Sequence, residues 1–355
     1  MWLIIYLLTI STLLVSCRTP TSSSKLSSDS NDVTHKPWLN YVNETKSKMP
    51  LQKSCEPTSF RHKTQERMGV VILMHGFTAC PQQFYALANQ LSVAGWDVLL
   101  PLLPGHGSQD QTHEQKTLPN RETYQSVMPA FVKQMNTIMR QYPSDNKVIG
   151  GLSLGSAYAT QAVLDDPSIY RRALLIIPYY KLSGLISSIL GGLNEISKSR
   201  ITSWFTPGEQ LTKAILERTI GWGQACLEER KGGRAGICDF DITHMIASQQ
   251  FGYDLSETVR LQVESQFVLV DKDKAVDNDR ILRVFHNSEA KRHICFYPDA
   301  ANHSLASRFD APTENKFWLE DFERDAIQYI TKGIPFRTNG SKIKGFDGCQ
   351  HGRRI

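Results

Sequence analysis

The sequence predicts an α/β protein built on a mostly parallel sheet with helices on both of its faces. Short, wholly apolar runs of strand length recur along the chain, which is typical of strands buried on both faces of a parallel sheet. Amphipathic segments of helical length separate these runs, so strand and helix alternate. The chain has 355 residues, 41% of them hydrophobic and 21% charged, which suits one large domain with an insert.

The ordered part of the chain is expected to begin near Met68. Unbroken apolar runs mark the strands, and apolar residues at helical spacing mark the helices between them. Gly and Pro residues close several of these elements. The expected order is a strand at 69–74, a helix at 81–91, a strand at 96–100, a helix at 121–141, a strand around 148–149 with a helix after it, a strand at 173–177, a strand at 267–270, a helix at 279–287, a strand at 293–297 and a helix at 314–331.

The alternation of strands and helices stops at about residue 179 and resumes at residue 266. Amphipathic helices are expected in between, at 182–196, 208–220 and 239–251, with no strong strand among them. In an open α/β sheet, ligands bind beyond the carboxyl ends of the strands, and an insert at this place is positioned to cover them. We therefore interpret residues 180–263 as a helical lid on a core formed by residues 69–179 and 264–332.

The first 16 residues are almost wholly apolar, and Cys17 follows them. The run is short for a membrane span but suits the apolar region of a signal peptide. Residues 14–17, L-V-S-C, resemble the lipobox of bacterial lipoproteins, in which cleavage precedes a lipidated Cys. We expect residues 1–17 to be a signal peptide with Cys17 as lipidation site, so that the protein is exported and anchored to a membrane of the cell envelope, at the outer membrane or periplasmic face. An ordinary cleaved signal and a short uncleaved anchor are the alternatives.

The two ends of the chain beyond the signal are expected to lie outside the core. Residues 18–55 are rich in Ser, Thr, Asp and Lys, which predicts a flexible tether. The basic, Gly-rich residues 333–355 are expected to form a peripheral C-terminal tail. The net charge is only +5, and the basic residues are scattered without interleaved aromatic residues, which gives no support for nucleic-acid binding.

Six cysteines besides Cys17 bear on the redox state of the protein, because an oxidising compartment would allow them to pair. Cys226 and Cys238 flank a Gly-rich turn and are the first candidate pair. Cys295 lies in an apolar strand, and one interpretation of it is a buried free thiol. The absence of C-x-x-C pairs and clustered His argues against a structural metal, and no cofactor is expected. The other three cysteines are Cys55, Cys80 and Cys349.

Residues 151–155, G-L-S-L-G, follow the pattern G-x-S-x-G between an apolar strand and a helix that opens with small residues. Such a turn lifts a Ser out of the sheet with its hydroxyl exposed. Ser153 would have a strained backbone, and a Cβ at Gly151 or Gly155 would collide with the neighbouring strand or helix. A Gly-rich turn with an inert Ser fits the same pattern, so the rest of the chain must supply a base, an acid and an oxyanion hole.

Candidate partners of Ser153 follow the last two predicted strands. Ester hydrolysis by a serine needs a base, a carboxylate that holds the base, and donors for the oxyanion. His303 follows the last strand, and Asp271, Asp273 and Asp277 follow the strand before it. The order Ser, Asp, His along the chain matches the arrangement of α/β-hydrolases.

The chain resembles α/β-hydrolases of the monoacylglycerol lipase and carboxylesterase group over residues 69–180 and 265–331. The segments that carry the resemblance are HGFT at 75–78, LPGHG at 103–107, GLSLG at 151–155, DKAV at 273–276 and NH at 302–303. The resemblance implies the α/β-hydrolase fold, with the helical lid inserted after the sixth strand. The chain departs from the group at Cys80, where Gly or Ser is usual, and near the acid, where a usual Gly is missing.

Carried over by position, the resemblance implies that Ser153 is the nucleophile, His303 the general base and acid, and Asp273 the acid that orients His303. Asp271 stays as the alternative for this acid. The backbone N–H groups of Phe77 and Leu154 would form the oxyanion hole. Structural roles are expected for His75 and His106, because their segments shape loops.

The resulting hypothesis is a serine hydrolase that cleaves carboxylic esters, either lipid-derived or short acyl esters. Its expected partners are a small-molecule ester or lipid, and a membrane reached through the lipid anchor. A lysophospholipase or an acyltransferase on the same triad is one alternative. A catalytically silent surface lipoprotein that binds a partner is the alternative from another class.

Overall fold

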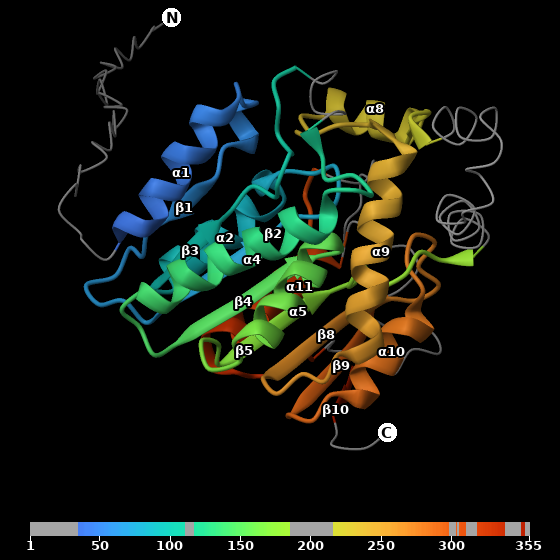
Figure 1. Ribbon diagram of the computed structural model, residues 1–355. Coiled ribbons are helices and arrows are strands. Elements are labelled where there is room, and N and C mark those ends of the chain that lie inside the picture. Colours follow the sequence, from blue (N-terminus) through green and yellow to red (C-terminus); the bar gives the residue numbers. More distant parts are fainter. Residues whose placement is uncertain are drawn as a thin grey trace, which may run out of the picture. The chain divides into compact units, whose positions relative to one another are not determined.

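The structure of the protein is a computed structural model that describes residues 35–110, 117–184, 216–297, 303, 305–309, 318–337 and 349–351 (Figure 1). Cys17, the predicted signal peptide and the first part of the predicted tether lie outside the described residues. So do most of the helices expected at 182–196 and 208–220, and most of the predicted tail. In the part that is described, no helix is both long and apolar enough to cross a membrane.

An eight-stranded sheet lies at the centre of the described structure, in the order β1-β3-β2-β4-β5-β8-β9-β10. The six inner strands run parallel, and the edge strands β1 and β10 pair antiparallel with their neighbours. The prediction of a mostly parallel sheet is therefore confirmed. The strands are β1 (Thr58–Phe60), β2 (Gly69–Met74), β3 (Trp96–Leu100), β4 (Lys147–Leu152), β5 (Arg172–Ile176), β8 (Glu264–Val270), β9 (Arg292–Tyr297) and β10 (Cys349–His351).

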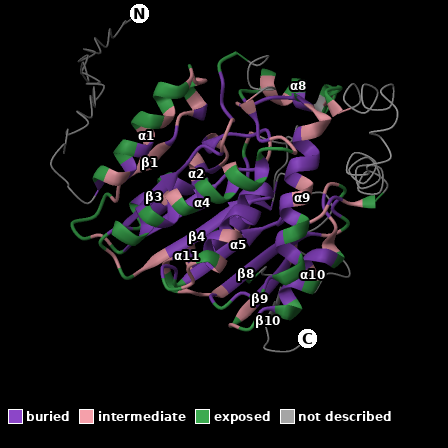
Figure 2. Ribbon diagram, in the orientation of Figure 1, coloured by how far each residue is buried: buried purple, intermediate pink, exposed green. Residues whose placement is uncertain are grey.

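Helices cover both faces of this sheet (Figure 1). On one face, α2 (Tyr85–Val93) packs against α11 (Leu319–Lys332). On the other face, α4 (Tyr124–Gln141) packs against α5 (Leu154–Asp165). Figure 2 shows the sheet as a buried layer, with exposed residues on the outer sides of the helices. This double cover explains why β2, β3 and β5 consist wholly of buried residues.

Residues 35–67, here called the N-terminal segment, are part of the fold, so the predictions of a tether up to residue 55 and of an ordered start near Met68 are wrong. The helix α1 (Lys36–Lys48) contacts α4 and buries Trp38 and Tyr41. The Tyr41 hydroxyl donates to the Leu102 carbonyl at 2.9 Å and accepts from the Leu102 N–H at 3.0 Å. Two aromatic residues three positions apart share one face of a helix, and here they dock a helix of mostly polar composition.

The insert follows β5, which is the fifth strand along the chain and not the sixth as predicted. One antiparallel strand, β1, and four parallel strands, β2 to β5, precede it. It contains a two-stranded antiparallel sheet of β6 (Thr219–Gly221) and β7 (Asp239–Asp241), with α8 (Gln224–Lys231) between them. The sequence predicts no strong strand in the insert, and the strands found there are only these two short ones in the described part. These strands are only three residues long, too short to show a period in the sequence.

The last helix of the insert belongs to the helical layer over the core rather than to a separate lid. This helix, α9 (Ile242–Thr258), packs against α4 and α5, and α10 (Asn278–Asn287) contacts it in turn. The approach is close, since a Cβ at Gly252 would lie 2.1 Å from the Tyr179 carbonyl oxygen. The predicted lid boundary at 263 is thus too late.

One disulfide ties the segment before β1 to the loop after β2, and another closes a loop within the insert. The predicted pair Cys226–Cys238 is confirmed, and Cys55 pairs with Cys80. Cys295 also forms a disulfide, so its interpretation as a free thiol is wrong. Cys349 lies opposite Cys295 in the register of β9 and β10. Apolar surroundings are common to buried thiols and disulfides, and therefore could not distinguish them.

Candidate active site

Ser153 lies in the sharp turn between β4 and α5, with φ 55° and ψ −117°. A positive φ is unfavourable for a residue with a side chain and persists only where the surroundings enforce it. Here the Ser153 N–H donates to the Ile176 carbonyl at 2.8 Å, and the Ser153 carbonyl accepts from the Tyr179 N–H at 3.1 Å. Both bonds tie the turn to the end of β5 and the residues after it.

The two glycines of the turn have no room for a side chain. A Cβ at Gly151 would lie 2.3 Å from the carbonyl carbon of Gly155, and one at Gly155 would lie 2.0 Å from the carbonyl oxygen of Met74. The helix α5 therefore excludes a Cβ at Gly151, and the strand β2 excludes one at Gly155, as the sequence predicts. The pattern did not reveal Ser156, whose buried hydroxyl contacts the Gly151 carbonyl and accepts from the Ile176 N–H at 2.9 Å. It joins β4 to β5 beneath Ser153.

The structure brings Ser153, His303 and Asp273 together. His303 Nε2 lies 2.8 Å from Ser153 Oγ. His303 Nδ1 lies 3.0 Å from Asp273 Oδ2 and 3.2 Å from Asp273 Oδ1. These distances suit a hydrogen-bonded relay in which Nδ1–H donates to the carboxylate and Nε2 accepts from the hydroxyl. The His303 side chain is 30% exposed, whereas that of Asp273 is fully buried.

Asp273, and not Asp271, faces His303. Its Oδ1 accepts from the Ala275 N–H at 2.7 Å and from the Val276 N–H at 2.9 Å. Burial by itself would raise the pKa of Asp273, but His303 and these two N–H groups outweigh it and lower the pKa below its ordinary value. The carboxylate is therefore ionised at neutral pH, as an acceptor for His303 must be.

The two predicted oxyanion donors lie at the ends of adjacent parallel strands. Phe77 follows β2, and Leu154 is the first residue of α5. A helix leaves its first N–H groups without an acceptor inside the helix. Within the described residues, neither of these two N–H groups donates a hydrogen bond to the protein. Both N–H groups therefore lack an acceptor among the described residues.

His75 and His106 brace the loops around these donors. The Leu103 N–H donates to His75 Nε2 at 3.0 Å, and the Thr78 N–H donates to His106 Nε2 at 3.2 Å. In both rings Nδ1 lies within 3.0 Å of a backbone carbonyl, so each ring accepts on one side and donates on the other. Burial lowers the pKa of both side chains, that of His106 to about 4. Both are neutral at neutral pH, which suits the expected structural roles.

Comparison with known proteins identifies the fold. The family described as the alpha/beta hydrolase fold matches residues 69–181. The monoacylglycerol lipase of Paleococcus ferrophilus superposes with a TM-score of 0.58 at 14% identity, over 81% of this chain and 100% of that chain. A soluble variant of monoglyceride lipase from Saccharomyces cerevisiae, in complex with a substrate analogue, superposes with a TM-score of 0.54 at 14% identity, over 78% of this chain and 91% of that chain. A carboxyl esterase from Bacillus coagulans, in complex with glycerol, superposes with a TM-score of 0.52 at 13% identity, over 77% of this chain and 92% of that chain.

The protein therefore has the α/β-hydrolase fold, and the fold prediction is confirmed. Its sequence is only distantly similar to lipases and esterases, and no curated protein matches it. In the portion of the chain that is described, no three His, Cys, Asp or Glu side chains gather as metal ligands would.

Proposed function

We propose that the protein is a serine hydrolase that cleaves carboxylic esters through an acyl-enzyme. The observation that carries this proposal is the continuous contact from Ser153 through His303 to Asp273 at a strained turn. His303 would take the Ser153 proton as Oγ attacks the ester carbonyl carbon, while Asp273 holds the ring in the required tautomer.

The same groups can complete the reaction. The N–H groups of Phe77 and Leu154 would donate to the oxyanion of each tetrahedral intermediate. His303 would return the proton to the leaving alcohol as the acyl-enzyme forms. A water molecule, deprotonated by His303, would then attack the acyl carbon and release the acid together with the Ser153 hydroxyl.

For the substrate, we infer a lipid-derived or short acyl ester, which rests on the structural likeness to a monoacylglycerol lipase and a carboxyl esterase. A lysophospholipase or an acyltransferase would use the same three side chains. Transfer to another alcohol requires that water be kept from the acyl-enzyme. The 30% exposure of the His303 side chain favours water as the acceptor, and hence hydrolysis.

We also propose that the protein is exported and lipid-anchored at Cys17. The apolar residues 1–16 and the L-V-S-C segment support this proposal. The pairs Cys55–Cys80 and Cys226–Cys238 add to it, because disulfides persist in oxidising compartments. Replacing Cys17 with Ser should release the protein from the membrane fraction of cells; an unchanged distribution would contradict the anchor.

The hydrolase proposal is tested with p-nitrophenyl esters from acetate to palmitate. Ser153→Ala should lower kcat roughly 10⁴-fold or more, because the nucleophile is lost. Ser126→Ala, at an exposed position of α4, is the matched control and should keep wild-type activity. A fluorophosphonate should label the wild type and the control, but not Ser153→Ala. If the wild type neither hydrolyses these esters nor reacts with the fluorophosphonate, a protein that only binds a partner becomes the better account.

A further inference from the structure

The residues after β2, here called the oxyanion loop (residues 75–80), are held by the insert through Thr78. Thr78 is fully buried and has φ 61°, which is costly for a β-branched residue. Its carbonyl accepts from the Ile237 N–H at 3.0 Å and from Arg234 Nη2 at 3.3 Å. Its hydroxyl accepts from Trp222 Nε1 at 2.8 Å. The insert therefore supplies three of the donors that fix this strained residue.

Two of these donors, Arg234 and Ile237, lie on the disulfide loop, defined as residues 226–238 and closed by the Cys226–Cys238 bond. Arg234 is buried, and its Nε lies 3.3 Å from Glu229 Oε2, so its charge has a partner within the same loop. Its Nη1 donates to the Ile237 carbonyl at 3.2 Å. The guanidinium of Arg234 thus connects two other residues of the disulfide loop, Glu229 and Ile237, with Thr78. Closure by a disulfide limits how far this loop can move.

The fit between the two loops is closest at Gly236. This residue has φ 106°, and a Cβ there would lie 2.2 Å from the Thr78 carbonyl oxygen. Gly233 in the same loop has φ 98°, but a Cβ there would have nothing within 4 Å. The two glycines therefore have the same backbone requirement, while only Gly236 contacts the oxyanion loop.

The position of Thr78 sets that of its neighbour Phe77, whose N–H is the proposed oxyanion donor. The carbonyl of Thr78 is fixed by the disulfide loop and its N–H by His106. With both peptide groups of Thr78 held, the preceding residue has little freedom to rotate. Displacement of a catalytic donor by about 1 Å can cost a factor of roughly 100 in rate. The disulfide loop is therefore placed to influence catalysis without touching a substrate.

We propose that the disulfide loop, through Arg234 and the backbone at Gly236, positions the Phe77 N–H in the oxyanion hole. Arg234 is a positioning residue for the reaction. The inference rests on the proposed hydrolase function and goes beyond it, because it assigns a positioning task to a part of the insert for which, among the described residues, no hydrogen bond to Ser153 or His303 is found.

The decisive comparison is between Gly236→Ala and Gly233→Ala. Both variants force a side chain into a positive φ, but only Gly236→Ala presses on the Thr78 carbonyl. For the p-nitrophenyl ester that the wild type hydrolyses fastest, kcat per fluorophosphonate-titrated site should fall roughly 10- to 100-fold in Gly236→Ala, with KM little changed. Gly233→Ala should keep the wild-type kcat per site.

A transition-state probe separates positioning from simple loss of structure. The tetrahedral adduct of a hexyl trifluoromethyl ketone places an oxyanion in the hole, so its affinity for Gly236→Ala should fall by about the same factor as kcat. A merely structural role would lower the melting temperature and the fraction of titratable sites. It would leave kcat per site and the affinity of each site for the ketone unchanged.

Arg234→Met provides a second, independent variant, and Lys231→Met is its matched control. Lys231 lies in the same loop, is 72% exposed and pairs with Glu228. Arg234→Met should lower kcat per site, whereas Lys231→Met should not. Arg234→Lys keeps a positive charge beside Glu229 and replaces Arg234→Met if that variant does not fold. If Gly236→Ala and the Arg234 variant both keep the wild-type kcat per site, the inference is overturned and the hydrolase proposal stays intact. If the wild type shows neither hydrolysis nor labelling, the hydrolase proposal itself is overturned.

Discussion

At the scale of single residues, backbone strain is concentrated at the carboxyl ends of the parallel strands. In the described chain, the non-glycine residues with positive φ are Thr78, Ser153, Ile177 and Lys272. They follow the carboxyl ends of β2, β4, β5 and β8, respectively. Ligands of open α/β sheets bind at these ends, and strained residues persist where the surrounding structure enforces them. The strain therefore locates the candidate site independently of the side chains that form it.

The role of Asp273 leads to a prediction at the same scale. In Asp273→Asn, keeping the bonds from the Ala275 and Val276 N–H groups would turn the amide NH₂ toward His303 Nδ1. Nδ1 would then have to accept, Nε2 would carry the proton, and the ring could no longer accept from Ser153. We expect kcat for p-nitrophenyl esters to fall roughly 10³- to 10⁴-fold. Asp271→Asn is the control and should keep its activity; equal losses in the two variants would contradict the assignment of Asp273.

Which residues could be placed from the sequence depends on how local their signals are. Ser153, Asp273 and His303 each occur in a short segment with its own pattern, so their positions could be predicted one at a time. The partners of Thr78 could not, because Trp222 and Arg234 lie 144 and 156 positions away in the chain. Only the folding of the insert brings these side chains to the oxyanion loop.

At the scale of elements, the inner strands were predictable because their apolar runs are nearly unbroken. The N-terminal segment was not, because composition averages over a stretch while docking depends on single residues. The helix α1 has a polar average, yet Trp38 and Tyr41 are 1% and 5% exposed. Leu39, on another side of the same helix, is 42% exposed. Two well-placed aromatic residues thus outweigh a composition that is typical of disorder.

The insert shows a second reason why elements were misassigned. Amphipathic helices of a lid and of a core layer have the same apolar period, so α9 could be recognised as a helix but not assigned to its layer. The close approach at Gly252 is a tertiary contact that no local pattern shows. The very short strands β6 and β7 pair with each other across a segment that contains the Cys226–Cys238 disulfide, and this pairing is likewise not visible in a local pattern.

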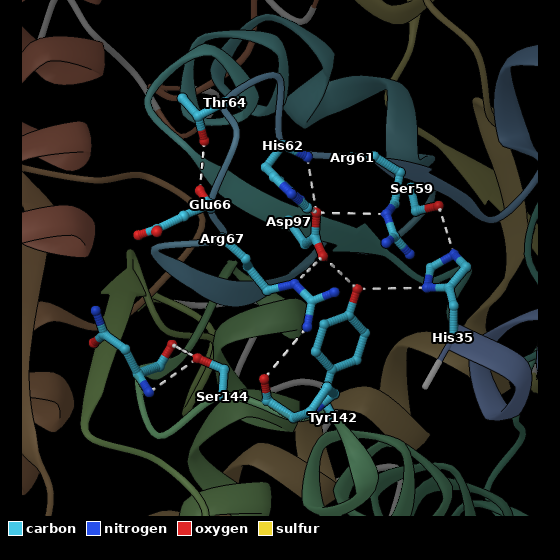
Figure 3. Close-up of polar contacts among 12 residues, drawn as sticks. His35, Ser59, Arg61, His62, Thr64, Glu66, Arg67, Asp97, Tyr142 and Ser144 are labelled. Carbon is cyan, nitrogen blue, oxygen red and sulfur yellow. Dashed lines mark hydrogen bonds and ion pairs between the residues drawn. The ribbon is translucent and has the colours of Figure 1, made fainter. Parts of the chain in front are cut away.

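At the scale of the whole molecule, a buried carboxylate joins the N-terminal segment to the sheet (Figure 3). Asp97, in β3, is fully buried. Its carboxylate accepts from the His62 N–H at 2.8 Å and from the Tyr142 hydroxyl at 2.7 Å. Arg67 Nε lies 2.8 Å from it and Arg61 Nε 3.6 Å. One side chain thus connects the segment after β1, the strand β3 and Tyr142, which follows α4.

The stability of the protein should depend strongly on this carboxylate. Removing one partner of a buried ion pair costs about 3 kcal/mol or more, because the other charge stays buried without it. Asp97→Asn should therefore lower the free energy of unfolding by about 3 kcal/mol at neutral pH, measured by urea denaturation. Asp145→Asn, at an exposed position, is the control and should change this free energy little.

The same two variants should also differ in how their stability depends on pH. Burial by itself would raise the pKa of Asp97, but the hydrogen bonds from His62 and Tyr142 and the charge of Arg61 outweigh it, so the folded-state pKa is lowered. A carboxyl with a lowered pKa stabilises the fold above its unfolded pKa, about 3.9, and this contribution is lost as the pH falls through the folded-state pKa. The difference in unfolding free energy between the wild type and Asp97→Asn should thus be constant above about pH 5 and should shrink below about pH 4. A difference that persists unchanged into stronger acid would show that the Asp97 carboxylate does not hold the N-terminal segment by its charge.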